Sequence, residues 1–368
     1  MYPMADIANN SFVNLHVHTH YSILDGAARI NELVDYVKEL GQPAVAITDH
    51  GNMHGAYELW STAVKKGIKP IIGIEAYVTP ETARQDRTRV HWGTEAQRSD
   101  DVSGGGAITH MTMWAENDEG LVNLMKASSV ANLEGLFGKW PRMDKEVLNT
   151  YHKGIIATTG CPSGIVQTRL RLGQFDEALR AAGEYQDIFG KDNYYVELMD
   201  HGLGIERRVR KELVEIAHKI GAPLVVTNDS HYVTPEGAVA QDDMLCINSG
   251  SHKDDPNRFK FDGTGYYVRS AQEMRELFKE FPEGCDNTLE IAERCNVIFD
   301  DHEDGAFMPE FDCPEGWDAT SLFLKKVDDG LRVRYPGGVP EEVARQADYE
   351  CGVICQMQFC GYFLVVAD

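Results

Sequence analysis

Residues 44–78 read AVAITDHGNMHGAYELWSTAVKKGIKPIIGIEAYV, and this stretch contains one complete strand–helix–strand unit. Its two apolar, β-branched runs, Ala44–Thr48 and Ile71–Val78, are separated by a segment long enough to form a helix. Gly67 lies where helix C-termini favour glycine, and Pro70 opens the second run. A unit of this kind predicts two parallel strands joined by a helix.

The same unit recurs along the first 235 residues. Helical periodicity lies between the apolar runs, as in Ile30, Leu33, Val34 and Val37. The other runs that predict strands are Phe12–Val17, Ile108–Trp114, Ile155–Thr159, Tyr194–Leu198 and Leu224–Thr227. Seven strands alternating with helices predict an α/β fold, a distorted seven-stranded (β/α)7 barrel of the TIM type rather than an open doubly wound sheet. No GxGxxG or Walker A loop occurs where a nucleotide site would need one.

The composition is that of a globular protein with a strongly acidic balance. The chain has 368 residues, 43% of them hydrophobic, and its formal net charge is −23. Such a charge disfavours a broad basic nucleic-acid groove, but bound divalent cations still permit a phosphate substrate. No apolar run approaches the roughly 20 residues of a membrane span, and the start shows no secretion signal. Eight cysteines without CxxC pairs are expected to be reduced, so we expect a cytoplasmic protein with no membrane partner.

Two segments depart from the repeating unit. Residues 79–107 are polar and carry four arginines (84, 87, 89 and 98), and a solvated surface loop is the favoured interpretation. After about Ser251, turn residues, prolines and helical stretches replace the alternation. We therefore expect a barrel domain at 1–265 and a C-terminal α+β extension at 266–368. The chain stops inside an apolar run at Asp368, so we expect the natural protein to continue.

Potential metal ligands recur at the ends of the predicted strands. His16 and His18, like Asp229 and His231, are spaced i and i+2, which places both side chains on one face of a strand. The remaining candidates on successive strands are His50, Glu75, His110 and Cys161. The carboxyl ends of barrel strands meet on one face, and this mixture of ligands suits zinc or manganese.

Two members of this set have plain alternatives, and other histidines are left out. His110 comes early in its strand, and a lone cysteine such as Cys161 is more often a small buried apolar residue. The histidines at 54, 91, 152, 201, 218, 252 and 302 look scattered and are not included.

Three longer motifs carry a family resemblance. They are residues 14–26 (NLHVHTHYSILDG), 46–53 (AITDHGNM) and 227–232 (TNDSHY). With them the chain resembles the alpha (catalytic) subunits of bacterial DNA polymerase III, beginning with their amino-terminal PHP domain, over essentially its whole length. Residues 266–268, 286–295 and 361–368 resemble the segments that lead into the polymerase palm, so the resemblance assigns 266–368 to the truncated start of the palm. In residues 357–363 (MQFCGYF) a glycine and a proline usual in the family are replaced, which puts the local turn in doubt.

The resemblance implies a metal centre with nine ligand positions, all of which are present here. These are His16, His18, Asp25, His50, Glu75, His110, Cys161, Asp229 and His231. It implies three divalent metals, zinc or manganese, with magnesium serving the polymerase of the full subunit. One ion would take His16, His18, Glu75 and Asp229, a second Asp25, His50 and His231, and a third Glu75, His110 and Cys161. It also implies catalytic roles for Asp25, His50, Glu75 and Asp229.

The implied function is part of DNA replication. The resemblance suggests a metal-dependent phosphodiesterase, a 3′–5′ exonuclease that proofreads 3′ ends of primer–template DNA, within a DNA-directed DNA polymerase. Its implied partners are the rest of the subunit, the sliding clamp, tau and epsilon. Two alternatives stay open: a catalytically silent, metal-stabilised scaffold, and a small-molecule phosphatase of the histidinol phosphatase kind. The chain alone is not expected to extend primers, because the palm carboxylates of the family lie beyond Asp368.

Overall fold

The computed structural model describes residues 10–23, 25–299 and 310–368, which form two compact units. The first unit ends at Phe299 and the second begins at Asp300. Leu24 of the first motif, most of the start examined for a secretion signal, and His302 lie outside the described residues.

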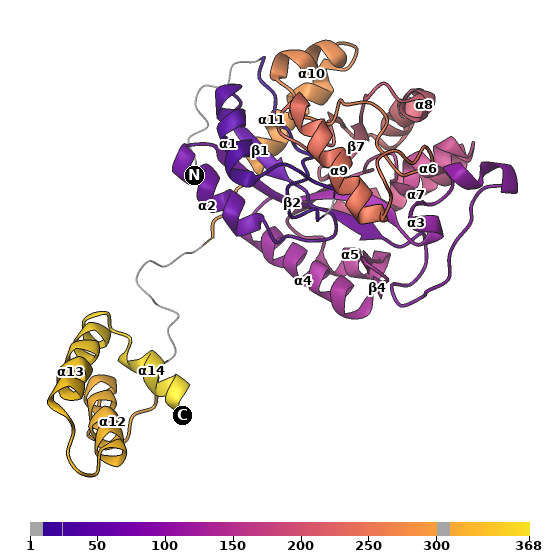
Figure 1. Cartoon of the computed structure of the whole chain (residues 1–368). Helices are drawn as coiled ribbons and strands as arrows, with labels where there is room; N and C mark the ends of the chain where they lie inside the picture. Colours follow the sequence, from indigo (N-terminus) through magenta and orange to yellow (C-terminus); the bar gives the residue numbers. More distant parts are fainter. Residues whose placement is uncertain (1–9, 24, 300–309) are drawn as a thin grey trace. The chain divides into compact units, whose positions relative to one another are not determined.

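The first unit is built on one mixed β-sheet (Figure 1). Its strands are β1 (Ala44–Ile47), β2 (Lys69–Val78), β3 (Thr109–Ala115), β4 (Leu136–Phe137), β5 (Trp140–Met143), β6 (Ile155–Thr158), β7 (Tyr194–Leu198) and β8 (Leu224–Val226). The order is β4-β5-β2-β3-β6-β7-β8, with β1 paired to β2. This confirms the predicted α/β class.

The predicted first strand, Phe12–Val17, is not a regular strand but occupies the place of one. Asn14 forms a parallel bridge to Val45 of β1, and Val17 forms another to Ser230, four residues after β8. The segment thus lies between the two ends of the β1–β8 path, as a barrel requires. Closure by seven strands stays a prediction.

Three antiparallel strand pairs, β4–β5 and the two pairs made by β3, correct the expectation of a wholly parallel sheet. β3 runs antiparallel both to β2 and to β6, whereas β1–β2, β6–β7 and β7–β8 are parallel. A parallel neighbour needs a crossover, usually a helix packed on the sheet. The β2–β3 connection, residues 79–108, holds only a 3₁₀-helix at Glu95–Asp100 and the short α3 (Ser103–Gly106), so the chain returns beside β2 in the opposite direction.

Amphipathic helices surround this sheet. They are α1 (Ile30–Glu39), α2 (Ala56–Lys66), α4 (Asp118–Glu134), α5 (Lys145–Tyr151), α6 (Ile165–Arg171), α7 (Phe175–Phe189), α8 (Gly204–Ile220), α9 (Ala238–Ser249), α10 (Ala271–Leu277) and α11 (Pro282–Arg294), with a 3₁₀-helix at Pro235–Gly237. α1 buries Ile30, Leu33, Val34 and Val37, the face that the sequence predicted. Gly67 ends α2 in the left-handed conformation.

The polar insertion at 79–107 folds against the β4–β5 hairpin, which the sequence did not predict. The buried Arg142 of β5 donates hydrogen bonds to the carbonyl oxygens of Arg84 (2.8 Å), Asp86 (2.6 Å), Ala107 (3.2 Å) and Gly135 (3.2 Å). Arg84 itself pairs with carboxylates of Glu134, Asp144 and Glu146. Its charge is therefore neutralised within the fold.

The expected domain boundary at 265/266 does not coincide with the division into units. Helix α11 packs on β8: Asn287 donates to the carbonyl oxygen of Leu224 (2.7 Å), and Ile291 and Ala292 lie in the same buried cluster as Val225. Burial of this helix therefore extends the first unit to Phe299.

The second unit, as far as it is described, contains helices alone. These are α12 (Ala319–Arg334), α13 (Glu341–Gln356) and α14 (Cys360–Ala367), which pack around Leu322, Phe323, Cys360 and Leu364. The α+β character expected of the extension is not found among residues 310–368. In the described part of the chain no single helix is long and apolar enough to cross a membrane, and α13 with α14 meets that test only as a pair bent by 112°.

Candidate metal centre

All nine predicted ligands lie around one cleft of about 310 Å³ or are buried beside it. Asp25, His50, Glu75, His110, Cys161, Asp229 and His231 line the cleft, and His16 and His18 are buried in contact with them. Four of them follow strand ends: His50 comes after β1, Cys161 after β6, and Asp229 and His231 after β8. The topology thus gathers residues separated by more than 200 positions.

The reversed direction of β3 explains the position of His110. This residue is the second of its strand, where a parallel strand would carry it to the wrong face. Because β3 is antiparallel, its beginning lies beside the carboxyl end of β2, and His110 pairs with Tyr77 there. The early position that weakened the sequence argument is therefore the position that brings the imidazole to the cleft.

Glu75 lies at the centre of the arrangement. Its Oε1 is 3.4 Å from His16 Nε2 and 3.1 Å from His110 Nδ1, and its Oε2 is 2.7 Å from His50 Nδ1 and 3.6 Å from His18 Nε2. The carboxylate is 1% exposed. One buried carboxylate surrounded by four imidazoles is suited to bridge neighbouring cations.

Two aspartates extend the set on either side of Glu75. Asp229 Oδ1 lies 3.1 Å from His18 Nε2 and 3.5 Å from His16 Nε2. Asp25 Oδ1 lies 3.3 Å from His50 Nε2 and 3.1 Å from His231 Nε2. The Oδ1 atom of each aspartate therefore lies beside imidazole nitrogens, and a cation could bind the oxygen and these nitrogens together.

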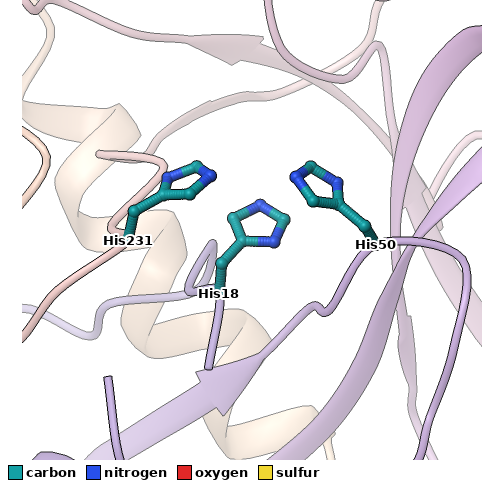
Figure 2. Close-up of side chains that lie close together, drawn as sticks. All are labelled: His18, His50 and His231. Atoms are coloured by element: carbon teal, nitrogen blue, oxygen red, sulfur yellow. The ribbon is translucent and has the colours of Figure 1, made fainter. Parts of the chain in front are cut away.

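Three groups of donor atoms lie close enough to hold an ion. Each group's atoms lie within 4.8 Å of one another: His16, His18 and Glu75; His18, His50 and His231; and His50, Glu75 and His110. Figure 2 shows the second group, whose three imidazole rings face a common space although they come from three different parts of the chain. The ring centroids of His18 and His50 are only 4.0 Å apart.

Cys161 lies at the edge of the third group. Its Sγ is 3.5 Å from His110 Nδ1, and it accepts a hydrogen bond from the backbone N–H of Ser163 (3.4 Å). Burial and the carboxylates of Glu75 and Asp229 raise the pKa of this thiol well above its usual value. Only a cation would hold Cys161 as a thiolate at neutral pH.

The hydrogen bonding of the polar atoms in the cleft shows whether the residues suit a metal ion. Many of them are buried without a hydrogen-bond partner: His16 Nε2, His18 Nε2, Asp25 Oδ1, His50 Nδ1, both Glu75 oxygens, Asp229 Oδ1 and His231 Nε2. Several lie within 3.6 Å of one another but in directions unsuited to hydrogen bonding. Buried polar groups are normally satisfied, and each unsatisfied one costs about 1–3 kcal/mol. Lone pairs that converge without donors are what divalent cations require, so the residues fit a metal cluster.

Electrostatics separate the imidazoles into two kinds. Burial and the neighbouring rings of His50 and His231 lower the pKa of His18 to about 3, so this ring is neutral and free to act as a ligand. Burial alone would lower the pKa of His16, but the carboxylates of Asp229 and Glu197 raise it well above its ordinary value. The buried carboxylates thus favour a positive charge at His16.

A supporting layer that sequence reasoning missed orients the ligands. Glu197 of β7 is 2.8 Å from His16 Nδ1 and accepts a hydrogen bond from the Thr227 hydroxyl (2.6 Å). The Ser22 hydroxyl lies 3.0 Å from His18 Nδ1 and donates to Asp49 (2.7 Å). Carboxylates on the outer nitrogen of a ligand histidine fix its tautomer and raise its basicity. A glutamate inside the apolar run Tyr194–Leu198 was the signal that could have identified Glu197.

His201, one of the histidines left out of the ligand set, is held by protein groups beside the cleft. Its Nδ1 is 2.6 Å from Glu206 Oε1, its Nε2 is 2.8 Å from the carbonyl oxygen of Asn228, and its ring stacks on Tyr266 at 4.1 Å. It lines the cleft. Both ring nitrogens are engaged, so His201 supports the wall of the cleft.

The comparisons with known proteins agree with this geometry. Residues 14–201 match the family described as PHP domain, and residues 321–368 match the bacterial DNA polymerase III alpha NTPase domain. The DNA polymerase III subunit alpha of Mycobacterium tuberculosis (strain H37Rv) is 53% identical over 362 residues, which cover 98% of this chain. That of Mycobacterium leprae is 53% identical over 360 residues, and that of Treponema pallidum is 42% identical over 363 residues.

The chain spans about 30% of the length of these curated relatives. Among solved structures, an amidohydrolase from Chromobacterium violaceum aligns over 61% of this chain and 88% of its own, with 15% identity and a TM-score of 0.36, too low to carry an argument. The match to the PHP domain covers half of the chain and contains seven of the nine residues that gather at the cleft. The resemblance inferred from the motifs is confirmed: the chain belongs to the PHP domain family and is a relative of the bacterial DNA polymerase III alpha subunits.

Proposed function

We propose that the cleft binds three divalent metal ions and hydrolyses phosphodiesters, releasing nucleotides from the 3′ ends of DNA in the 3′–5′ direction. The observation that carries the proposal is the set of buried, unpartnered polar atoms that converge on the cleft. Clustered divalent ions supply an activated water and stabilise charge on the phosphoryl group. The cleft opens to solvent, as a site for strand ends requires.

Three sets of side chains would each bind one of the three ions. His16, His18, Glu75 and Asp229 form one set, and the pairing of Asp25 with His50 and His231 forms a second. Glu75 with His110 and Cys161 forms the third. The nitrogen, oxygen and sulfur donors favour zinc or manganese. Asp25, His50, Glu75 and Asp229 are the residues we assign to catalysis, because they line the cleft where a substrate phosphate would enter.

The decisive experiment replaces Asp25 by asparagine. The amide keeps the shape of the side chain but is a weaker, neutral ligand for the ion that Asp25 would hold together with His50 and His231. Release of 3′ nucleotides from mismatched primer DNA should therefore fall by at least 100-fold. The matched control is Asp35→Asn on α1, an exposed aspartate that pairs with Lys66. Undiminished release by Asp25→Asn, with metal content confirmed, would contradict the proposal.

One structural feature favours the scaffold as a second candidate. The metal-ligand set joins the start of the unit to its last strand, because His16 and His18 meet Asp229. Ions held there would brace the unit whether or not hydrolysis occurs. The scaffold predicts that removing metal lowers the melting temperature while no nuclease activity is found to be lost.

We also propose the role of the whole protein from its relatives. The second unit would be the beginning of the polymerase palm, and the protein a replicative DNA polymerase in the cytoplasm, with magnesium at its polymerase site. Its proposed partners are primer–template DNA, the remaining part of the subunit, the sliding clamp, tau and epsilon. The similarity of residues 321–368 to the polymerase III alpha family supports this proposal.

A further inference from the structure

Aromatic side chains form one wall of the cleft, next to the metal-ligand set. Phe259, Phe261 and Tyr266 line it together with Lys260 and Asp262. The rings touch in series: Phe259 and Phe261 have centroids 6.0 Å apart, and Phe261 and Tyr266 4.7 Å. Phe261 also meets His231 edge-on at 4.8 Å. The aromatic wall is therefore in direct contact with a candidate metal ligand, His231.

Packing accounts for two of these rings but not for the third. Tyr266 is buried, and its carbonyl oxygen accepts a hydrogen bond from the backbone N–H of His231 (2.7 Å). Phe261 is half-buried between His231 and Tyr266. Phe259 is 61% exposed. Phe259 therefore presents an uncovered aromatic face at the mouth of the cleft.

The segment that carries Phe259 is held in place. Arg258 donates to both carboxylate oxygens of Asp242 on α9, at 2.7 and 2.8 Å, and to the carbonyl oxygen of Lys253 (3.1 Å). A two-pronged Arg–carboxylate pair fixes both distance and orientation. The segment between α9 and α10 crosses the first unit in Figure 1. The exposed ring is thus preorganised beside the cleft.

Lys260 adds a cation to this wall. It is exposed, its neighbours Phe259 and Phe261 are aromatic, and it lines a cleft whose other charged groups are mostly carboxylates and imidazoles. Aromatic rings interleaved with a basic residue are the usual surface for single-stranded nucleic acid, because bases stack on the rings and the cation meets a phosphate.

We propose that Phe259, supported by Phe261 and Tyr266, stacks on the unpaired terminal base of a DNA strand, while Lys260 meets its phosphate. This inference rests on the proposed hydrolysis of 3′ ends and specifies its substrate: an unpaired end, because a base within a duplex presents no free face to the ring. Phe259 is a positioning residue, which acts on binding and not on the bond that breaks.

The test measures binding and cleavage separately on the full 368-residue chain with Mn²⁺ present. For binding, a single-stranded oligonucleotide carries 2-aminopurine at its 3′ end behind a phosphorothioate linkage that resists hydrolysis, and stacking quenches its fluorescence. Phe259→Ala and Phe259→Leu should remove the quenching and weaken binding by about 10-fold, within the range measured for single base–aromatic stacks. Phe259→Trp should restore both, and Tyr57→Ala, an exposed ring on α2 outside the cleft, should change neither.

For cleavage, each protein is assayed on ends that carry a base or an abasic sugar. The abasic end should raise KM of the wild-type chain about 10-fold, should leave Phe259→Ala unaffected, and should change kcat little in either. Equal quenching by wild type and Phe259→Ala, or an equal KM of the two proteins for the base-bearing end, would overturn the stacking by Phe259. If 3′ nucleotides are still released in that case, the proposed hydrolysis stands. If the quenching follows the expected pattern but no protein releases 3′ nucleotides, the hydrolysis is refuted and the stacking of Phe259 on the terminal base is established.

Discussion

At the scale of single residues, the cleft is defined by polar atoms that have no partner in the protein. Glu75 illustrates the cost, since both of its oxygens are buried and neither has a hydrogen bond. The imidazoles of His110 and His50 lower its pKa well below the usual range although burial opposes this. A carboxylate kept ionised in this setting is prepared for a cation.

Cys161 gives the first prediction at this scale. Cys161→Ser should lower the metal content by about one ion per chain, because a serine hydroxyl is a poor ligand where a thiolate is held by zinc. The fold should persist, since the two side chains are nearly isosteric. Metal analysis by mass spectrometry with a thermal melt checks it, and Cys246→Ser on α9 is the control. An unchanged metal content would show that Cys161 is a buried packing residue and not a metal ligand.

Glu197 gives the second. Glu197→Gln keeps an acceptor for Thr227 but removes the charge beside His16 Nδ1. Metal affinity at the His16 set should fall by about 10- to 100-fold, the usual effect of losing such an outer carboxylate. Competition with a fluorescent chelator measures it. Glu177→Gln, an exposed residue of α7 paired with Arg180, should leave the affinity unchanged; equal affinities for both variants would contradict the role of Glu197.

At the scale of elements, the direction of one strand decides the site. The i, i+2 spacing of His16 with His18 and of Asp229 with His231 was readable from the sequence, although neither pair lies on a regular strand: β8 ends at Val226, and Asp229 has a positive φ of 42°. The reversal of β3 was not, since it depends on how the insertion at 79–107 folds against β5. The nine candidate ligands followed from motifs that this family shares, whereas the role of Glu197 became visible only when β7 was placed beside His16.

Arg142 provides a prediction about the insertion at residues 79–107. It is 1% exposed, and its guanidinium joins residues 84, 86, 107 and 135. Arg142→Met should cost about 3 kcal/mol of unfolding free energy, because four carbonyl oxygens lose a charged donor. It should also expose the insertion to trypsin at its arginines. Urea unfolding and timed proteolysis measure both effects.

The control for that variant lies in the same insertion. Arg98 is mostly exposed and lies 3.6 Å from Glu95, so Arg98→Ala should change stability by no more than about 0.5 kcal/mol. Equal urea midpoints for Arg142→Met and the wild type would show that the insertion does not depend on this guanidinium.

At the scale of the whole molecule, the net charge of −23 and the metal centre are linked. An acidic chain repels DNA, and the buried carboxylates of Asp25, Glu75 and Asp229 concentrate negative charge inside the cleft. Bound cations would offset this charge, satisfy the unpartnered atoms and allow a phosphate to approach. Stability and DNA binding should therefore both depend on divalent metal.

Chelation tests this dependence directly. Ions that bind the folded unit but not the unfolded chain stabilise it by about 2.7 kcal/mol at a concentration 100 times Kd. Removing them with EDTA should lower the melting temperature of the first unit by about 5–10 °C, given the usual 2–4 °C per kcal/mol for large domains. Excess zinc or manganese should restore it. Glu75→Gln, which lacks the carboxylate shared by the ligand groups, should melt at the same lower temperature with or without EDTA. If metal-free and metal-loaded wild type melted together, the converging atoms would not be a metal centre.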